Sequence, residues 1–264
     1  MPTVTIIIPC HNEADGLAQL RARLDGALSR LESATGCRCG VLLFDNGSTD
    51  DTLAGMRRLF GDDGRFAVHH SPVNRGIGGA LRDGLGLTDA EILVTMDADC
   101  TYDPLEAVPL VQAVLDGWDV ATGSPYHPRG GVVGVPRWRL VLSRGLSRLY
   151  WLVAPLKLWT YTSMFRAYRR AGLLSITWLS DGFLSTSEIL MESAASGLTI
   201  YELPTTLSTR RYGQSKIRIL RVMRDHLRYL GRLATDGAFR RRLRENFRPA
   251  PASPAPQHLT VERT

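Results

Sequence analysis

The amino-acid sequence predicts an α/β fold, in which helices cover both faces of an open and mostly parallel sheet. Apolar, β-branched runs alternate with segments of helical periodicity from residue 4 to residue 122, and this order is typical of parallel strands joined by crossover helices. The chain has 264 residues, of which 44% are hydrophobic and 22% are charged, so it can bury a substantial core. This composition excludes a collagen, a coiled coil and a wholly disordered chain.

Local patterns predict each element of this alternation in turn. The expected strands are the apolar runs 4–9, 41–44, 66–70, 92–96 and 120–122. Leucines at helical spacing predict a first helix over 14–33, and Ser48 or Thr49 is suited to cap the second. Small residues favour a third helix over 76–87, and Pro104 opens the fourth.

The pattern changes beyond residue 123. A basic loop rich in glycine and proline covers 123–136, and an amphipathic, aromatic-rich stretch follows over 138–159. The elements expected next are a helix over 187–196, a strand over 198–203 and a basic amphipathic helix over 218–230. Four closely spaced prolines predict a disordered tail over 247–264.

Charge is segregated along the chain. Residues 1–128 carry 18 acidic and 9 basic side chains, whereas residues 129–170 carry 9 basic and no acidic ones. Residues 205–248 carry 13 basic and 3 acidic side chains. Basic blocks of this size indicate a partner that carries phosphates, such as an anionic membrane surface, a phosphorylated substrate or a nucleic acid. A nucleic acid is not expected, because the sequence contains no recognised nucleic-acid-binding motif.

Neither a membrane span nor a cysteine framework is expected. No apolar run reaches the roughly 18 residues that a spanning helix needs, and the nearest candidate, 149–159, is interrupted by Pro155 and Lys157. The four cysteines form no Cys-x-x-Cys pair and follow no secretory leader. A disulfide framework and a structural zinc site are therefore not expected.

Two carboxylates follow the fourth expected strand. Alternate residues of an extended segment point to the same side, so Asp97 and Asp99 face one point while Ala98 faces away. Hard divalent cations prefer such oxygen ligands together with phosphate oxygens, although a solvated acidic turn is the alternative. Asp45 and Asn46, which follow another strand, should reach the same edge of the sheet, where parallel sheets bind ligands.

Three further features have both a structural and a functional interpretation. The glycine-rich segment 74–80 allows either tight packing or the close approach of a ligand. Arg210 and Lys216 flank a basic turn, which is either a solvated loop or a clamp for a diphosphate. Glu188 lies one helical turn from Glu192, as expected for a salt-bridging surface pair or for a catalytic carboxylate.

The motifs form a series when they are taken in chain order. They are Val4-Thr-Ile-Ile-Ile-Pro-Cys-His-Asn-Glu13, Asp45-Asn-Gly-Ser-Thr-Asp50, Asn74-Arg-Gly-Ile-Gly78, Asp97-Ala-Asp99, Thr162-Ser-Met-Phe-Arg-Ala-Tyr-Arg169 and Arg210–Lys216. This series resembles the family 2 glycosyltransferases, and within them the dolichol-phosphate mannosyltransferase branch. The resemblance implies a Rossmann-like GT-A fold, a GDP- or UDP-hexose as donor, and Mg²⁺ or Mn²⁺ as cofactor.

The resemblance also implies a role for individual residues. The nucleotide sugar would be held by Pro9, His11, Glu13, Asp45, Asn46, Asp97 and Ala98. The metal would be bound by Asp97 and Asp99. The catalytic set would be Asp99, Arg210, Lys216 and Glu188, with Arg210 and Lys216 covering the diphosphate. The acceptor phosphate would be held by Ser124, Arg139 and Ser143.

The chain departs from the family pattern at five positions, which include Thr101 in place of a frequent glutamine and Thr160 in place of an acid. His11 stands where the family usually has a tyrosine, and Asn46 stands where it has a second aspartate. Pro125 replaces an arginine of the lipid-phosphate branch, which removes one phosphate contact. Arg129 and Arg137 are candidates to replace that contact.

The expected reaction is the inverting transfer of a hexose, of mannose or glucose type, to a polyprenyl or dolichyl phosphate. A catalytic domain over 1–217 would act at the cytoplasmic face of a membrane, and a basic amphipathic helical extension over 218–246 would face that membrane. The sequence leaves open whether a separate membrane subunit takes part. The alternative is a soluble family 2 glycosyltransferase that acts on a hydroxyl of a glycan, metabolite or protein, with Asp181 or Glu188 as general base.

Overall fold

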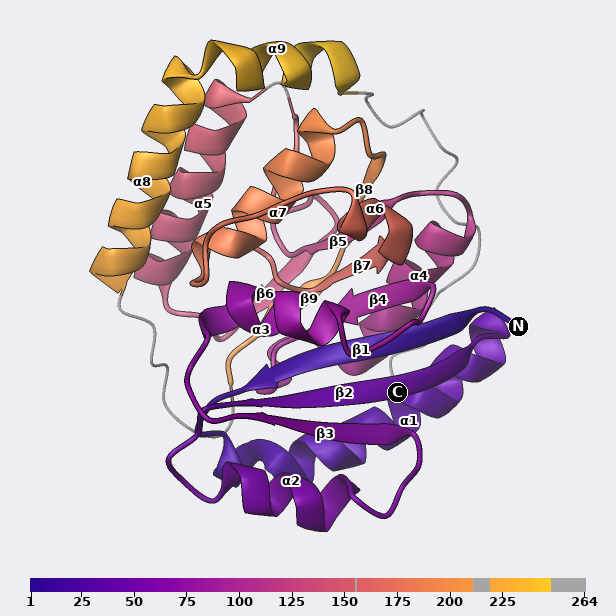
Figure 1. Cartoon of the computed structure of the whole chain (residues 1–264). Helices are drawn as coiled ribbons and strands as arrows, with labels where there is room; N and C mark the ends of the chain where they lie inside the picture. The colour runs from indigo at the N-terminus through magenta and orange to yellow at the C-terminus, as the bar shows by residue number, and fades with distance from the viewer. Residues whose placement is uncertain (155, 211–218, 248–264) are drawn as a thin grey trace.

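The computed structural model describes residues 1–154, 156–210 and 219–247, and its centre is a seven-stranded sheet (Figure 1). The strands lie in the order β3-β2-β1-β4-β7-β5-β8. They are β1 (Thr3–Cys10), β2 (Arg38–Asn46), β3 (Phe66–Ser71), β4 (Ile92–Thr95), β5 (Val120–Ser124), β7 (Arg166–Arg169) and β8 (Ile200–Pro204). Because only β7 runs antiparallel to its neighbours within this described sheet, the expected mostly parallel α/β architecture is confirmed.

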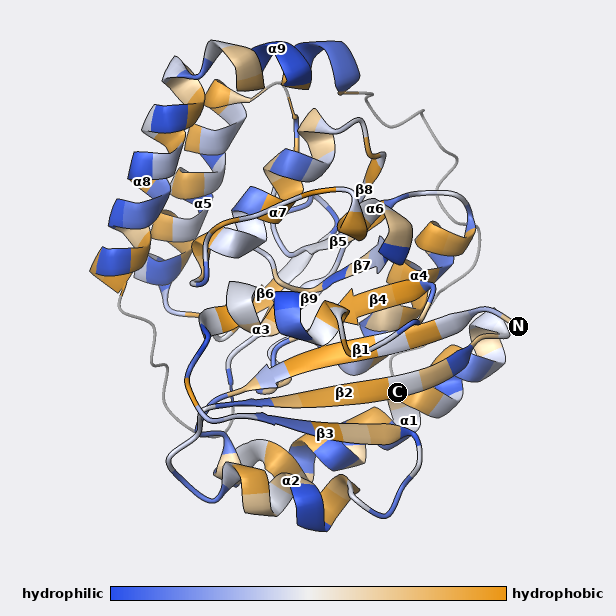
Figure 2. Ribbon diagram, viewed as in Figure 1, coloured by the Kyte–Doolittle hydropathy of each residue, from blue (hydrophilic) through white to orange (hydrophobic). Residues whose placement is uncertain are grey.

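Helices cover both faces of the sheet. They are α1 (Leu17–Thr35), α2 (Thr52–Phe60), α3 (Gly76–Leu85), α4 (Ala107–Leu115), α5 (Arg137–Val153), α6 (Arg170–Leu174), α7 (Leu184–Ala195), α8 (Ile219–Thr235) and α9 (Gly237–Asn246), with short 3-10 turns at Ala14–Gly16 and Pro104–Glu106. Side chains alternate across β1, so Ile6 and Ile8 join the core under α1, α2 and α4, while Ile7 joins the core under α3 and α7. Figure 2 shows the apolar strands β1, β2 and β4 between these layers.

The sequence analysis missed β7, although this strand lies inside the sheet, between β4 and β5. Arg166 interrupts its apolar pattern, yet this side chain is fully buried. The guanidinium donates hydrogen bonds to Oγ1 of Thr122 at 3.0 Å, to the carbonyl of Tyr161 at 2.9 Å and to the carbonyl of Thr186. Oxygen partners from three segments therefore satisfy a buried cation, and a hydropathy pattern cannot reveal them.

A second, two-stranded sheet begins in the segment that was expected to be a loop. β6 (Gly131–Val133) pairs in parallel with β9 (Thr206–Ser208). Beyond this pairing, the amide of Thr209 donates to the carbonyl of Val133 at 3.2 Å, and the amide of Ser208 donates to the carbonyl of Thr101 at 2.8 Å. The end of β9 is therefore held beside the turn that follows β4.

The last two helices, α8 and α9, pack on the core that lies under α3 and α7. Figure 1 shows α8 alongside α5, with α9 across their upper ends. Leu230 and Leu243 are buried in the core, and the Tyr150 hydroxyl lies 2.8 Å from Nδ1 of the buried His226. No helix in the described parts of the chain is long and apolar enough to span a bilayer. The expected domain boundary at 217–218 and all but the first residue of the expected tail lie outside the described residues, so this division stays a prediction.

Candidate active site

A cavity of about 1010 Å³ opens beyond the carboxyl ends of β1, β2 and β4. It is lined by Pro9, Cys10, His11, Glu13, Asn46, Asn74, Gly76, Ile77, Asp97, Ala98, Asp99, Thr101, Tyr126, Val135, Pro136, Arg139, Ser143, Met164, Gly182, Phe183, Leu207, Ser208, Thr209 and Arg210. The wall combines loops that follow parallel strands with the start of α5 and the end of β9. This is the edge at which open parallel sheets bind ligands.

The turn after β4 supplies the acidic part of the wall. The backbone amide of Thr101 donates to Oδ1 of Asp99 at 3.0 Å. Cys100 is buried and has a left-handed φ of 52°, a conformation that costs backbone free energy in a residue other than glycine. Burial and the charge of Asp99 raise the pKa of Asp97 to about 7, while the charge of Arg210 lowers it. Tertiary packing thus holds two carboxylates together at the cavity.

The loop after β1 is tied to the loop after β2. Asn12 has a left-handed φ of 55°, and its backbone amide donates to Oγ of Ser48 at 2.9 Å. The side-chain oxygen of Asn12 accepts from the amide of Thr49 at 2.7 Å. These bonds fix His11 and Glu13, the flanking residues, in the cavity wall.

Arg210 reaches the acidic turn from the end of β9. Its Nη2 donates to both carboxylate oxygens of Glu13, at 2.8 and 2.7 Å. Its Nε lies 3.3 Å from Oδ2 of Asp99, within ion-pair distance. The guanidinium is therefore placed between carboxylates from two different loops.

The oxygen donors of this wall fit a hard divalent cation. Asp97 and Asp99 present carboxylates to the same cavity, and Mg²⁺ is typically held by one or two carboxylates together with phosphate oxygens. Within 1–154, 156–210 and 219–247, no three His, Cys, Asp or Glu side chains form a preassembled metal cluster. The two aspartates would thus hold such an ion with phosphate oxygens of a bound ligand as its further partners.

Asp45 and Asn46 end β2 in different environments. Asp45 is fully buried, its Oδ2 lies 2.7 Å from Nδ1 of His70, and it does not line the cavity. Asn46 lines the cavity, donates to the carbonyl of Gly76 at 3.1 Å and accepts from the amide of Arg75 at 2.7 Å. Asn46 therefore fastens the glycine-rich segment to β2, and a carboxylate here would lack the donor.

The glycines of segment 74–80 serve both packing and the cavity. A Cβ atom added to Gly78 would lie 2.1 Å from the carbonyl oxygen of Ser180, so only glycine allows this approach. The amide of Gly78 also donates to the carbonyl of Asp181 at 2.7 Å. Gly76, with a φ of 64°, lines the cavity. The packing interpretation thus holds for Gly78 and also for Gly76, where an added Cβ atom would lie 2.2 Å from the carbonyl oxygen of Asp181.

The residues expected at the acceptor phosphate are separated by the structure. Arg139 and Ser143 line the cavity from the first two turns of α5. Ser124 is fully buried, and its hydroxyl lies 2.7 Å from the hydroxyl of Thr160. Because Ser124 does not line the cavity, direct contact with an acceptor phosphate does not fit its position.

Glu188 also lies away from the cavity. It is buried, and its carboxylate accepts from the amides of Leu179 at 3.2 Å and Ser180 at 2.8 Å. The expected catalytic role does not fit this position, because both oxygens hold the backbone of the segment that leads to Phe183 in the cavity wall. Lys216, the other cation expected at the diphosphate, lies outside the described residues.

Sequence reasoning missed several of the cavity residues that lie beyond residue 123. The clearest cases are Tyr126, Val135, Met164, Phe183 and Leu207. They reach the cavity through irregular loops and through the β6–β9 pair, which no periodicity predicts. Met164 lay within a motif that the sequence analysis had singled out, and Tyr126 follows the Pro125 position that it discussed.

Comparison with known proteins identifies the family. The sequence matches the family described as Glycosyl transferase family 2 over residues 5–176. The chain belongs to this family. It is 32% identical over 219 residues to the polyprenol monophosphomannose synthase of Mycolicibacterium smegmatis, with 80% of each chain covered. It is 30% identical over 220 residues to the undecaprenyl-phosphate mannosyltransferase of Micrococcus luteus, with 81% of this chain and 87% of that protein covered.

Solved structures agree with this assignment at the level of the fold. The family 2 glycosyltransferase described here resembles glucosyl-3-phosphoglycerate synthase from Mycobacterium tuberculosis, crystallised with Mn²⁺, uridine diphosphate and phosphoglyceric acid. The TM-score is 0.66 at 20% identity, with 89% of this chain and 79% of that chain covered. The GT-A-like fold expected from the resemblance is therefore confirmed, and the chain is a glycosyltransferase.

Proposed function

We propose that this glycosyltransferase transfers a hexose, of mannose or glucose type, from a nucleotide sugar to a polyprenyl phosphate at a membrane surface. The observation that carries the proposal is its similarity, over four-fifths of the chain, to two enzymes named for mannosyl transfer to polyprenyl phosphates. The cavity supports it, because an acidic wall faces the same space as Arg139 and Ser143 of α5.

The donor would bind between the loops that follow β1, β2 and β4. Pro9, His11 and Asn46 offer a wall for the nucleoside. Asp97 and Asp99 would hold Mg²⁺ or Mn²⁺, which when bound stabilises the charge of the leaving nucleoside diphosphate. Arg210 lies beside Asp99 and would donate hydrogen bonds to the diphosphate oxygens.

The acceptor chemistry favours a phosphate over a hydroxyl. Neither Asp181 nor Glu188, the carboxylates expected to serve a hydroxyl acceptor, lines the cavity. A phosphate monoester is already ionised at neutral pH, so it needs no general base. Its oxygen would attack the anomeric carbon as the bond to the diphosphate breaks, which inverts the configuration and requires no proton transfer. Arg139 lines the cavity and would orient that phosphate.

One surface of the molecule is suited to a lipid headgroup layer. We call it the α5–α8 face, and its exposed apolar residues are Trp138, Val141, Leu142, Leu149, Leu152, Leu220 and Leu227. Exposed arginines alternate with them, namely Arg137, Arg139, Arg144, Arg148, Arg221, Arg224, Arg228 and Arg232. Apolar side chains flanked by cations are typical of helices that lie in a membrane interface. The start of α5 would then lie at the membrane and at the cavity together.

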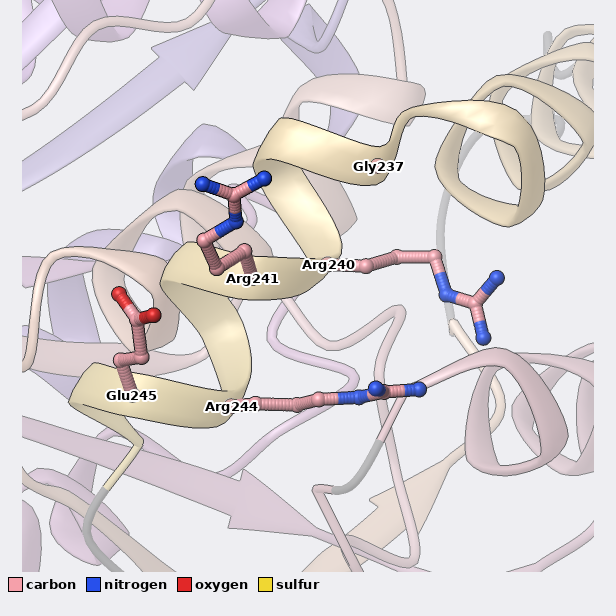
Figure 3. A pocket seen from close by; sticks show the side chains of 5 residues that line it. All are labelled: Gly237, Arg240, Arg241, Arg244 and Glu245. Atoms are coloured by element: carbon pink, nitrogen blue, oxygen red, sulfur yellow. The ribbon is translucent and has the colours of Figure 1, made fainter.

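The following helix adds further positive charge. Figure 3 shows Arg240 and Arg244 extending to the same side of α9, with Arg241 on another side of the helix. With Gly237 and Glu245 they line a shallow hollow of about 410 Å³. We propose that the enzyme binds peripherally to the anionic cytoplasmic leaflet through these helices, because each cation near such a surface contributes about 1 kcal/mol.

A substrate panel tests the proposed reaction. Purified protein is incubated with GDP- or UDP-hexoses and short polyprenyl phosphates, with Mg²⁺, Mn²⁺ or a chelator, and glycolipid formation is measured. Metal-dependent product is expected, and Asp97→Asn should lower kcat/KM by about 100-fold or more. The control is Asp103→Asn, because Asp103 caps the turn at Pro104–Glu106 outside the cavity. Transfer to a free hydroxyl, with no lipid-phosphate product, would contradict the proposal.

A further inference from the structure

Arg210 occupies the acidic side of the cavity. Its Nη2 donates to both carboxylate oxygens of Glu13, at 2.8 and 2.7 Å, and its Nε lies 3.3 Å from Oδ2 of Asp99. The three side chains are only 18%, 18% and 19% exposed. Charge interactions are strong at such partly desolvated positions. The guanidinium therefore lies beside the same carboxylate oxygen of Asp99 that a bound metal cation would use.

The backbone holds this contact in place. Ser208 and Thr209, which precede Arg210, are hydrogen bonded to the carbonyls of Thr101 at 2.8 Å and Val133 at 3.2 Å. On the opposite side, the amide of Glu13 donates to Oγ1 of Thr52 at 2.8 Å. Both ends of the ion pair are thus anchored, so little conformational entropy is lost when the pair forms. The contact is a built part of the cavity wall.

We propose that Arg210 is an internal counter-ion of this site, which competes with a divalent cation and is released by a nucleoside diphosphate. The second half of this statement rests on the proposed function, because it needs a diphosphate ligand. A cation that takes Oδ2 of Asp99 repels the guanidinium, and release of Arg210 would leave Glu13 partly buried without this positive partner. The bare cation therefore binds weakly.

A bound diphosphate changes the competition between Arg210 and the divalent cation for Asp99. Its oxygens offer Arg210 charge-assisted hydrogen bonds that replace the contact with Glu13, and they offer the cation further ligands. Each ligand therefore raises the affinity for the other, which is a positive coupling between the two. The site would take up the cation and the nucleoside diphosphate together and would hold neither of them tightly alone.

Titration of the full-length protein with Mn²⁺ alone tests the counter-ion. Free Mn²⁺ is followed by electron paramagnetic resonance, for the wild type and for Arg210→Gln. The variant is expected to bind Mn²⁺ about tenfold more tightly, since the competing ion pair with Asp99 is removed. Arg210→Lys keeps a positive charge and should retain weak binding. The control is Arg23→Gln, because Arg23 pairs with Asp103 outside the cavity; this variant should bind Mn²⁺ as the wild type does.

Titration with UDP and GDP at saturating Mn²⁺ tests whether a nucleoside diphosphate releases Arg210 from its contact with Glu13. Arg210→Gln should bind the nucleoside diphosphate about tenfold more weakly than the wild type, so the two ligands change affinity in opposite directions. Equal Mn²⁺ affinities of the wild type and Arg210→Gln would overturn the proposal that Arg210 competes with the divalent cation. A wild type that forms no glycolipid would instead overturn the proposed function, while the titration with Mn²⁺ alone would still decide the role of Arg210.

Discussion

Single residues hold the active-site loops in shapes that their own conformational preferences disfavour. Asn12 and Cys100 are the residues other than glycine that have a positive φ in the described parts of the chain, and both flank cavity residues. Hydrogen bonds to Ser48 and Thr49 offset the free-energy cost of the left-handed backbone at Asn12. Packing around the buried side chain of Cys100 keeps that residue in the same conformation. Strained backbone of this kind is typical of sites in which side chains must be placed in advance.

At the residue scale, Asn46→Asp is expected to destabilise the protein by about 1–3 kcal/mol. The carboxylate still accepts from Arg75, but it faces the carbonyl of Gly76 without a donor. Urea unfolding measures the change. Asp62→Asn is the control, because it makes the reverse exchange at an exposed site on the chain. An unchanged midpoint for Asn46→Asp would show that the amide does not fasten the glycine-rich segment.

Elements that are distant in sequence complete the cavity. β7 enters the sheet between β4 and β5, and the β6–β9 pair brings Arg210 to the turn after β4. The five strands and four helices expected over 4–122 are all present, because each has a local periodic pattern. β7 and the β6–β9 pair were not predicted, because their stabilisation comes from partners far along the chain.

At the element scale, contact between α5 and α8 should make the stability depend on pH. Burial lowers the pKa of His226 from 6.5 to about 4. Below pH 6.5 this histidine binds a proton in the unfolded chain but not in the folded chain, so its contribution to the free energy of unfolding falls as the pH falls towards 4. The slope from this group is at most about 1.4 kcal/mol per pH unit.

Two variants test whether the pKa of His226 is lowered by its burial or by its hydrogen bond with Tyr150. His226→Phe removes the titrating group, so the free energy of unfolding of the wild type, measured in urea, should fall relative to that of the variant as the pH is lowered from 6.5 to 4. Tyr150→Phe removes the hydrogen-bond partner but leaves His226 buried, so the slope should persist at a lower overall stability. The same slope in His226→Phe and in the wild type would contradict this origin.

On the scale of the whole molecule, the cavity and the α5–α8 face share the first turns of α5. Arg139 belongs to both, since it lines the cavity and is exposed beside Trp138. An acceptor phosphate at the headgroup level could therefore reach the donor while its apolar chain stays in the bilayer. The acidic body of residues 1–128 and the basic helices of the second half give the molecule an oriented charge distribution.

Vesicle binding tests this orientation. Removing two arginines from the face, in Arg148→Gln/Arg228→Gln, should weaken binding to phosphatidylglycerol vesicles by about 30-fold, from about 1 kcal/mol per cation. Co-sedimentation in low and high salt provides the measurement. Arg57→Gln/Arg58→Gln removes the same charge from α2, at the opposite end of the view in Figure 1, and should bind as the wild type does. An equal loss of vesicle binding in both double variants would show that binding does not depend on the α5–α8 face.

The sequence by itself determined the alternation of strands and helices, the family, and the place of the two aspartates at the end of β4. These features depend on local periodicity and short motifs, which neighbouring residues encode. Only the tertiary structure decided that Asp45, Ser124 and Glu188 lie outside the cavity wall and that Arg210 pairs with Glu13. Whether a polar side chain meets a ligand or the protein depends on which distant segment packs against it, and no local pattern contains that information.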